Sequence, residues 1–195
     1  MHRILHRVNT IEKLQSTPKE LGVEVDIRSN EGRLIVHHDP FTKGELFEDW
    51  LNVFEHGKLI LNVKEEGLEE RLLGLMKQYN INDFFFLDQS FPFLRKTATM
   101  GERRCAVRVS EYENIETALS LSGMVEWVWV DCFTCFPLNS EEVDKLKSAG
   151  LKLCFVSPEL QGRAEHDHVI EFRKYIELLG IKGDAVCTKY PDLWA

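Results

Sequence analysis

Short apolar runs alternate with longer amphipathic stretches along the whole chain. The apolar runs cover residues 3–6, 23–28, 59–64, 84–88, 105–109, 127–131, 151–156 and 184–188. Stretches with helical spacing lie between them, at residues 68–79, 115–121, 141–149 and 169–179. Strands that alternate with helices favour a parallel sheet covered by helices, and eight strands are the number that closes a β/α barrel.

The length of the chain limits how complete such a barrel can be. Its 195 residues lie just below the usual barrel length of roughly 200 or more, so we expect short or missing helices near residues 42–57 and 91–101. An open, doubly wound sheet competes with the barrel, but no glycine-rich phosphate loop follows the first strand. We find no internal repeat or linker. We therefore predict one α/β domain over residues 1–195, a compact (β/α)8 TIM barrel with some short or missing helices.

Polar side chains close the apolar runs. They are His6, Arg7, Asp26, Arg28, Asn62, Lys64, Asp88, Arg108, Asp131, Ser157, Thr188 and Lys189. In β/α barrels the catalytic groups sit at the carboxyl ends of the strands. This placement therefore predicts an enzyme-like face.

Two carboxylates lie within the second run. Glu24 and Asp26 are two positions apart in a strand, so their side chains point to the same face. Like charges on an apolar strand repel each other and resist burial. A positive group must share their space: a divalent cation, Arg28 on the same face, or a protonated histidine. The purely structural alternative is an ion pair with Arg28 or Lys64.

A tight turn at residues 29–32 leads into another short strand, residues 33–36, which ends in a histidine pair before Asp39 and Pro40. Strand alternation turns only one of two adjacent histidines inward. His37 and His38 are therefore alternatives for one inward position. For His6, the alternative to a functional role is a surface histidine near the end of the chain.

Composition and charge exclude some classes of function. The chain is 44% hydrophobic and 29% charged, which is ordinary for a globular protein, and its net charge of −8 argues against a general nucleic-acid binder. No run reaches membrane-spanning length and no apolar leader opens the sequence, so we expect a cytoplasmic protein without a transmembrane segment. The odd count of five cysteines favours reduced thiols, and we interpret Cys132 and Cys135 as buried thiols at a strand end.

Four segments, in order along the chain, carry a resemblance to a known family. They read His-Arg-Val-Asn-Thr at 6–10, Glu-x-Asp at 24–26 with His-Asp-Pro at 38–40, Asn-x-Lys at 62–64, and Thr-Lys-Tyr-Pro-Asp at 188–192. With these motifs the chain resembles the glycerophosphodiester phosphodiesterases, a branch of the phospholipase-C-like phosphodiesterase barrels. The middle of the chain, residues 68–183, supports only the repeating architecture.

The resemblance implies a phosphoric diester hydrolase of lipid metabolism, acting on a glycerophosphodiester or a related small-molecule phosphodiester. It implies a divalent cation, Mg²⁺ or Ca²⁺, and roles for seven residues: metal ligands Glu24, Asp26 and Asn62, the acid/base pair His6 and His38, and phosphate contacts from Arg7 and Lys64. A hard cation takes oxygen ligands, and the near-neutral pKa of histidine suits proton transfer to and from the reacting oxygens.

Three positions depart from the family pattern. Asn62 stands where the family has Glu, Val8 replaces a Gly, and Lys189 replaces an Asp. Asparagine coordinates through its carbonyl oxygen but brings no charge, so we expect weaker metal binding. Asn62 is otherwise a polar plug at the barrel mouth. Two alternatives stay open: a catalytically degraded barrel that binds a phosphorylated ligand or a partner protein, and a metal-independent phosphodiesterase that uses Arg28.

The remaining candidates have ordinary interpretations. Asp131 either binds substrate or caps a helix. Trp127 and Trp129 share one face of their strand, and we expect both to pack under helices. We interpret residues 165–168, Glu-His-Asp-His, as a solvated helix start, and the glutamates between residues 65 and 70 as an exposed acidic turn.

Overall fold

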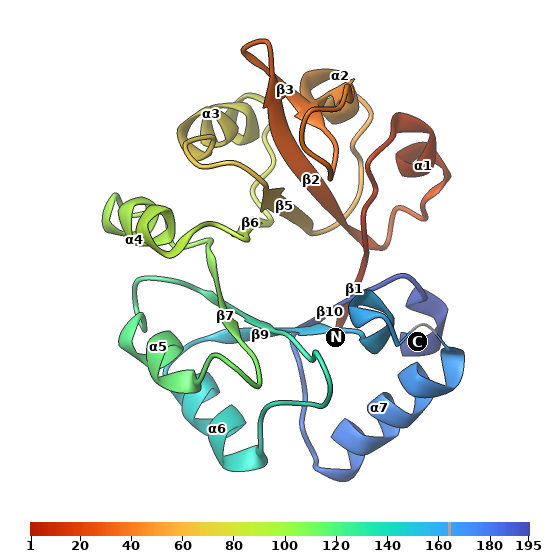
Figure 1. Ribbon diagram of the computed structural model, residues 1–195, viewed down its shortest axis with the longest axis vertical. Coiled ribbons are helices and arrows are strands. Elements are labelled where there is room, and N and C mark those ends of the chain that lie inside the picture. Colours follow the sequence, from red (N-terminus) through yellow and green to blue (C-terminus); the bar gives the residue numbers. More distant parts are fainter. Residues whose placement is uncertain (164) are drawn as a thin grey trace.

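The computed structural model describes residues 1–163 and 165–195, and a curled sheet of eight parallel strands lies at its centre (Figure 1). The strands are β1 (His2–Leu5), β2 (Gly22–Asn30), β5 (Leu59–Val63), β6 (Phe84–Leu87), β7 (Ala106–Val109), β8 (Trp127–Val130), β9 (Lys152–Val156) and β10 (Ala185–Thr188). Their order in the sheet is β6-β5-β2-β1-β10-β9-β8-β7. All eight predicted strands are present, which confirms the α/β class.

One seam of this sheet carries little backbone pairing. Between β6 and β7 the described residues form a single isolated parallel bridge, from Phe86 to Cys105, with a hydrogen bond from Phe86 N to Arg104 O (2.8 Å). The strands thus have the number, direction and order of a β/α barrel. A continuous ladder that would close the barrel is not observed at this seam in the described part of the chain.

A hairpin extends the sheet beyond the carboxyl end of β2. The nine-residue β2 pairs antiparallel with β3 (Arg33–Val36), and β3 pairs antiparallel with β4 (Glu45–Leu46). The turn places Gly32 at φ 76°, a conformation that glycine adopts without steric cost. The amide of His37 donates to Asp26 O (3.0 Å), so the hairpin returns the histidine pair to the carboxyl end of the parallel strands.

Helices cover the outside of the sheet (Figure 1). They are α1 (Ile11–Ser16), α2 (Phe47–Leu51), α3 (Glu69–Gln78), α4 (Phe91–Thr99), α5 (Ile115–Ser120), α6 (Ser140–Ser148) and α7 (His166–Leu178), with the 3₁₀ helices η1 (Pro158–Gln161) and η2 (Pro191–Trp194). None of the described helices is long and apolar enough to cross a membrane.

The helix predictions were correct in part. The expected shortening near residues 42–57 is present, because α2 has five residues. The shortening expected near 91–101 is wrong: α4 has nine residues, with Pro in its first turn and Leu94 and Ala98 buried on one face. The helix start at 165–168 is confirmed by α7. In the acidic turn Glu66 and Glu70 are exposed, as expected, and Glu65 is half-buried. Glu69 is buried and accepts hydrogen bonds from Gly67 N and Gln89 Nε2 (both 3.1 Å).

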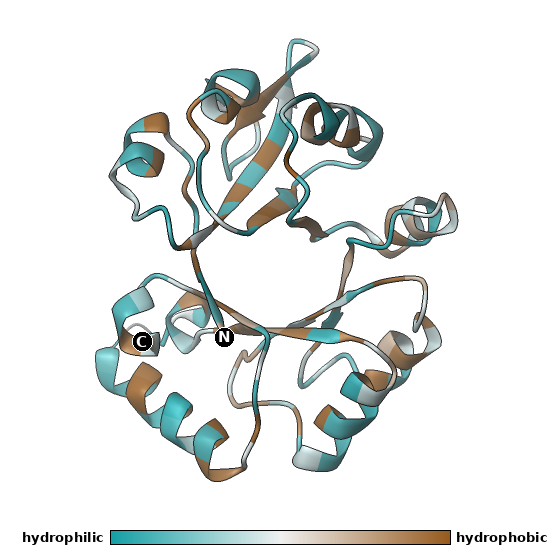
Figure 2. Cartoon of the chain, turned by 180° about the vertical axis from the view of Figure 1, so that it is seen from behind, coloured by the Kyte–Doolittle hydropathy of each residue, from teal (hydrophilic) through white to brown (hydrophobic). Residues whose placement is uncertain are grey.

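Two layers of apolar side chains hold the sheet, one on each face. Figure 2 shows apolar and polar positions alternating along the long strand β2. The outer layer packs under the helices and includes Val128 and Val130, whereas Trp127 and Trp129 belong to the inner layer with Phe85 and Ala106. The predicted placement of both tryptophans under helices is therefore wrong. Their rings fill the interior, where small neighbours such as Ala106 leave room and the Phe85 ring stacks on Trp127 (4.6 Å between centroids).

The five cysteines are all free. Cys132 is buried, as expected, but Cys135 is exposed, because it lies in the loop beyond the strand end. Burial raises the pKa of the Cys105 thiol to about 12. The expected cytoplasmic location stays a prediction.

Candidate functional site

The two carboxylates of β2 lie at the mouth of the curled sheet, between β1 and β5. Both Glu24 and Asp26 are fully buried, and Asp26 is in register with Asn62 of β5. His6 directly follows β1, where its amide donates to Thr188 O (2.9 Å) of β10. The strand pairing thus brings one imidazole, two carboxylates and one amide side chain into a single group.

Glu24 is held by three neighbours. Asn62 Nδ2 donates to Glu24 Oε1 (2.7 Å), Arg7 N donates to Oε2 (2.6 Å), and His6 Nε2 lies 3.8 Å from Oε2. Arg7 reaches this geometry with a left-handed backbone, φ 52°, which is uncommon for a residue with a side chain. Burial, followed by repulsion from Asp26, raises the pKa of Glu24 to about 7. This carboxyl group therefore changes charge near neutral pH.

Asp26 is neutralised by cations from two other segments. Lys64 Nζ lies 3.2 Å from Asp26 Oδ1, and Arg7 Nε lies 3.8 Å from Oδ2. Asn9 adds a reciprocal pair of hydrogen bonds, from its Nδ2 to Asp26 Oδ2 (2.6 Å) and from Asp26 N to its Oδ1 (3.0 Å). Of the positive groups considered from the sequence, Lys64 is the one that contacts this carboxylate.

His6 is a partly buried and neutral imidazole. Burial, followed by the nearby charges of Arg7 and Lys189, lowers its pKa to about 3. The expectation of a near-neutral pKa does not hold for His6, because the site surrounds it with cations. Its Nδ1 is buried without a hydrogen-bond partner among the described residues. At neutral pH this ring can therefore accept a proton and has none to donate as an imidazolium.

The histidine pair His37 and His38 lies on the rim of the site. His38 is partly exposed; its Nδ1 contacts Asp39 Oδ1 (2.8 Å), and its backbone oxygen accepts from Arg28 Nε (2.9 Å). His37 holds the loop together, with its Nδ1 next to Asp39 N (3.0 Å) and Thr42 Oγ1 (2.9 Å). No hydrogen bond or ion pair joins His38 to Glu24 or Asp26 within residues 1–163 and 165–195.

Arg28 ties the hairpin to the neighbouring strand. Besides His38 O, it contacts Lys64 O through one guanidinium nitrogen (3.3 Å), which also lies 3.6 Å from Glu65 Oε1. The guanidinium thus pairs with Glu65 at the rim, whereas Lys64 pairs with the buried carboxylate of Asp26.

A belt of alternating charges runs along the strand ends from β2 to η1. Its members, in order, are Asp26, Lys64, Asp88, Arg108, Asp131 and Gln161. Lys64 Nζ lies 3.2 Å from Asp88 Oδ2, and Asp88 pairs with Arg108 across the β6–β7 seam. Asp131 accepts from Gln161 Nε2 (2.6 Å) and from Cys132 N (3.1 Å), and burial raises its pKa. Asp131 is therefore a member of the belt and does not cap a helix.

Two residues of the site, Asn9 and Glu159, were not predicted from the sequence. For Asn9, the only indication in the sequence was its place in the His-Arg-Val-Asn segment. Glu159 carried no signal; it is buried and accepts from Thr188 Oγ1 (2.6 Å), Lys189 N (2.7 Å) and the Ser157 hydroxyl. It fixes the chain that places Lys189 near His6. Val8 points away from the site, into the outer apolar layer.

The donor set can be compared with what a divalent cation requires. Asp26 Oδ1 and Asn62 Oδ1 are buried oxygens without a hydrogen-bond partner among the described residues, and Mg²⁺ and Ca²⁺ bind such oxygens. Within the same residues, no three His, Cys, Asp or Glu side chains form a group that could hold a metal ion. The residues present thus fit a cation through two carboxylates and one amide, with Lys64 competing for Asp26.

Solved structures share this fold. No protein-family model and no curated protein sequence matches the chain. A crystal structure of glycerophosphodiester phosphodiesterase from Agrobacterium tumefaciens str. C58 aligns over 99% of this chain and 97% of its own, with a TM-score of 0.65 and 13% sequence identity. A glycerophosphoryl diester phosphodiesterase from Parabacteroides distasonis ATCC 8503 aligns over 98% of this chain and 84% of its own, with a TM-score of 0.66 and 14% identity. The chain has the fold of these enzymes, which confirms the resemblance at the level of fold.

Proposed function

We propose that this protein is a phosphoric diester hydrolase that acts on a glycerophosphodiester or a related phosphodiester. The observation that carries the proposal is the buried pair Glu24 and Asp26 beside His6, at the strand ends of a fold shared with two such enzymes. We regard the curled sheet as a (β/α)8 barrel whose β6–β7 ladder is reduced to one bridge. Such substrates would place the activity in lipid metabolism.

The chain's own residues would move the protons. The neutral His6 ring takes a proton from the attacking hydroxyl as the oxygen of that hydroxyl bonds to phosphorus. Burial and cationic neighbours keep the ring unprotonated beforehand, and the negative charge of the bound phosphodiester offsets those cations, so that the ring accepts the proton more readily. As the bond from phosphorus to the leaving oxygen breaks, His38 donates a proton to that oxygen from the rim. Arg7 and Lys64 neutralise the phosphoryl oxygens, and Lys64, which lies 3.2 Å from both Asp26 Oδ1 and Asp88 Oδ2, exchanges part of this pairing for the phosphate of the substrate.

A first test uses glycerophosphocholine and glycerophosphoinositol as substrates with the purified protein. We expect His38→Ala and His6→Ala each to lower kcat by about 10²-fold or more, since proton transfer contributes on that order. His37→Ala is the matched control, because the hydrogen bonds of the His37 side chain stay within its own loop in the described structure, and we expect it to keep most of the activity. Unchanged turnover in His38→Ala would remove His38 from the mechanism.

We propose that Glu24, Asp26 and Asn62 hold a divalent cation, Mg²⁺ or Ca²⁺. When bound, it would offset charge on the phosphoryl oxygens. Because Asn62 is uncharged, we expect Asn62→Glu to bind Ca²⁺ more tightly than the wild type, by about tenfold, in calorimetric titration. Asn52→Glu, at an exposed position, is the control. Equal Ca²⁺ affinity in all three proteins would show that these three residues do not hold the cation.

A second candidate function is binding without turnover. It is favoured by the way the site already satisfies its own charges: Lys64 pairs with Asp26, and Asn62 donates to Glu24. In that case no diester is hydrolysed, with or without Mg²⁺ or Ca²⁺, while glycerol 3-phosphate still binds and Lys64→Ala abolishes this binding. Hydrolysis by the wild type would exclude it.

A further inference from the structure

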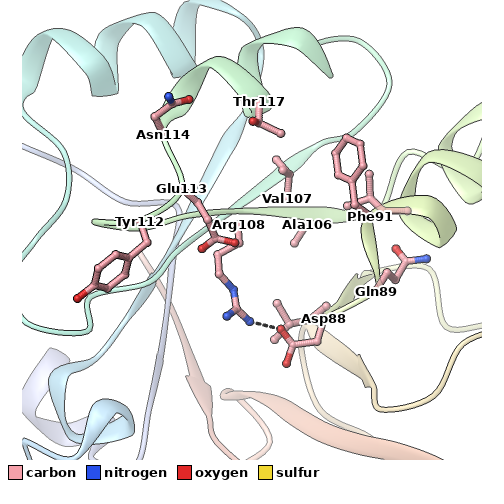
Figure 3. Close-up of a pocket in the computed structure, with 12 residues that line it drawn as sticks. Asp88, Gln89, Phe91, Ala106, Val107, Arg108, Tyr112, Glu113, Asn114 and Thr117 are labelled. Atoms are coloured by element: carbon pink, nitrogen blue, oxygen red, sulfur yellow. Dashed lines mark hydrogen bonds and ion pairs between the residues drawn. The ribbon is translucent and has the colours of Figure 1, made fainter.

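A cavity opens beside the proposed reaction site, at the weakly paired β6–β7 seam. Its volume is about 620 Å³, and it lies between α4 and α5 (Figure 3). Leu87 and Ala106 on its wall belong to the inner apolar layer, whereas Val107 belongs to the outer layer. The cavity therefore reaches the sheet at the place where β6 and β7 separate, and touches both faces of it.

Direct contacts connect the cavity to the buried carboxylates. Asp88 lines the cavity and lies 3.2 Å from Lys64 Nζ, which in turn lies 3.2 Å from Asp26 Oδ1. A smaller hollow of about 240 Å³ is lined by Lys64, Asp88 and Gln89, and the last two also line the larger cavity. A compound whose phosphate contacts Lys64 can thus extend into the cavity without crossing the protein core.

The lining carries groups that suit hydroxyls. Asp88 and Arg108 form an ion pair on the cavity wall, and Asn114 and Thr117 of the α5 side are exposed in the cavity (Figure 3). Carboxylate, guanidinium, amide and hydroxyl groups together accept from and donate to a polyol. The exposed ring of Tyr112 adds an apolar face. A hydrocarbon chain in this cavity would remove these polar groups from water without giving them partners, which is unfavourable.

We propose that this cavity binds the alcohol part of the phosphodiester, and that this alcohol is a sugar or another cyclic polyol. The inference rests on the proposed function, because the phosphate of the same molecule must contact Lys64. Arg108 donates to one hydroxyl and Asp88 accepts from its neighbour, so adjacent hydroxyls are recognised together. Volumes of this size are usual for small-molecule sites.

Thr117→Trp tests the cavity without touching the carboxylates or histidines. Thr117 is exposed, so an indole there fills the cavity at little cost to the fold, which circular dichroism verifies. We expect at least a tenfold lower kcat/KM on glycerophosphoinositol and less than a twofold change on the methyl ester of glycerol phosphate. Glu116→Trp, an exposed neighbour on α5 outside the cavity lining, should leave both values unchanged. Equal effects of Thr117→Trp on the two substrates would overturn the proposal.

A binding readout separates this inference from the proposed function. Saturation-transfer NMR with free myo-inositol needs no turnover; we expect a signal with the wild type and with Glu116→Trp, and its loss with Thr117→Trp. No signal with the wild type, or the same signal with all three, overturns the polyol cavity even if diesters are hydrolysed. Absence of hydrolysis with a cavity-dependent signal overturns the hydrolase and keeps the polyol site.

Discussion

Burial gives Glu24 and His6 opposite responses to pH, although they are neighbours in one site. Glu24 binds its proton more tightly in the folded chain, with a pKa of about 7 against an ordinary 4.5. His6 binds its proton less tightly, with a pKa of about 3 against an ordinary 6.5. The folded state therefore loses stability through Glu24 as pH rises from 4.5 to 7, and gains stability through His6 as pH rises from 3 to 6.5.

This opposition predicts that two single variants will have opposite pH slopes. In Glu24→Gln the contribution of His6 remains, so the free energy of unfolding should rise with pH between 4.5 and 6.5. In His6→Gln the contribution of Glu24 remains, so it should fall over the same range, by up to about 3 kcal/mol by pH 7. Urea unfolding at several pH values, with a chelator present, measures both. Parallel slopes in the two variants would contradict the assignment.

The sequence could predict which side chains share a face, but only in part which of them pair. Period-two spacing placed Glu24 and Asp26 together because it is a property of one strand. The choice between Arg28 and Lys64 as the positive partner depends on strand register, which pairs Asp26 with Asn62 and sends Arg28 to the rim. Asn9 reaches the site through a loop, and no periodicity describes loops.

At the scale of elements, the strands were predictable because each is a short, separate apolar run. Which face of a strand is turned towards the interior of the sheet was harder to predict. Alternation correctly grouped Trp127 with Trp129, but a strand buried on both sides gives no sign of which side is the interior. The weak pairing at the β6–β7 seam could not be predicted either. Both strands are ordinary apolar runs, and their poor pairing appears only in the arrangement of the whole sheet.

Because backbone pairing at the seam is so limited, the ion pair between Asp88 and Arg108 should matter locally. In Asp88→Asn we expect faster hydrogen exchange at the Phe86 amide, which bonds Arg104 O across the seam, by about tenfold. Global stability should change by less than about 1 kcal/mol, because the pair is partly exposed. Asp144→Asn, exposed on α6, is the control. Unchanged exchange at Phe86 would show that the ion pair does not hold the seam.

At the scale of the whole molecule, the two ends of the described chain meet. β1 pairs with β10, and Met1 and Ala195 line one hollow of about 290 Å³, as the neighbouring N and C labels in Figure 1 also show. The ladder between the first and last strands is therefore strong, while the weak seam lies in the middle of the chain. This ladder joins the segments that are farthest apart in sequence, which costs loop-closure entropy.

This arrangement predicts the outcome of circular permutation. Joining residue 195 to residue 1 through a short Gly/Ser linker and opening the chain between Gly101 and Glu102 gives an order in which every long ladder joins consecutive parallel strands. Opening between Glu66 and Gly67 instead makes the β5–β6 ladder join the two new ends. We expect both permuted chains to be soluble, and the chain opened at the seam to have the higher Tm by several degrees. The reason is that its strand order has the smaller loop-closure entropy cost. Thermal unfolding followed by circular dichroism measures both Tm values. A lower Tm for the chain opened at the seam would mean that the covalent link through α4, more than the pairing of the other strands, keeps the sheet curled.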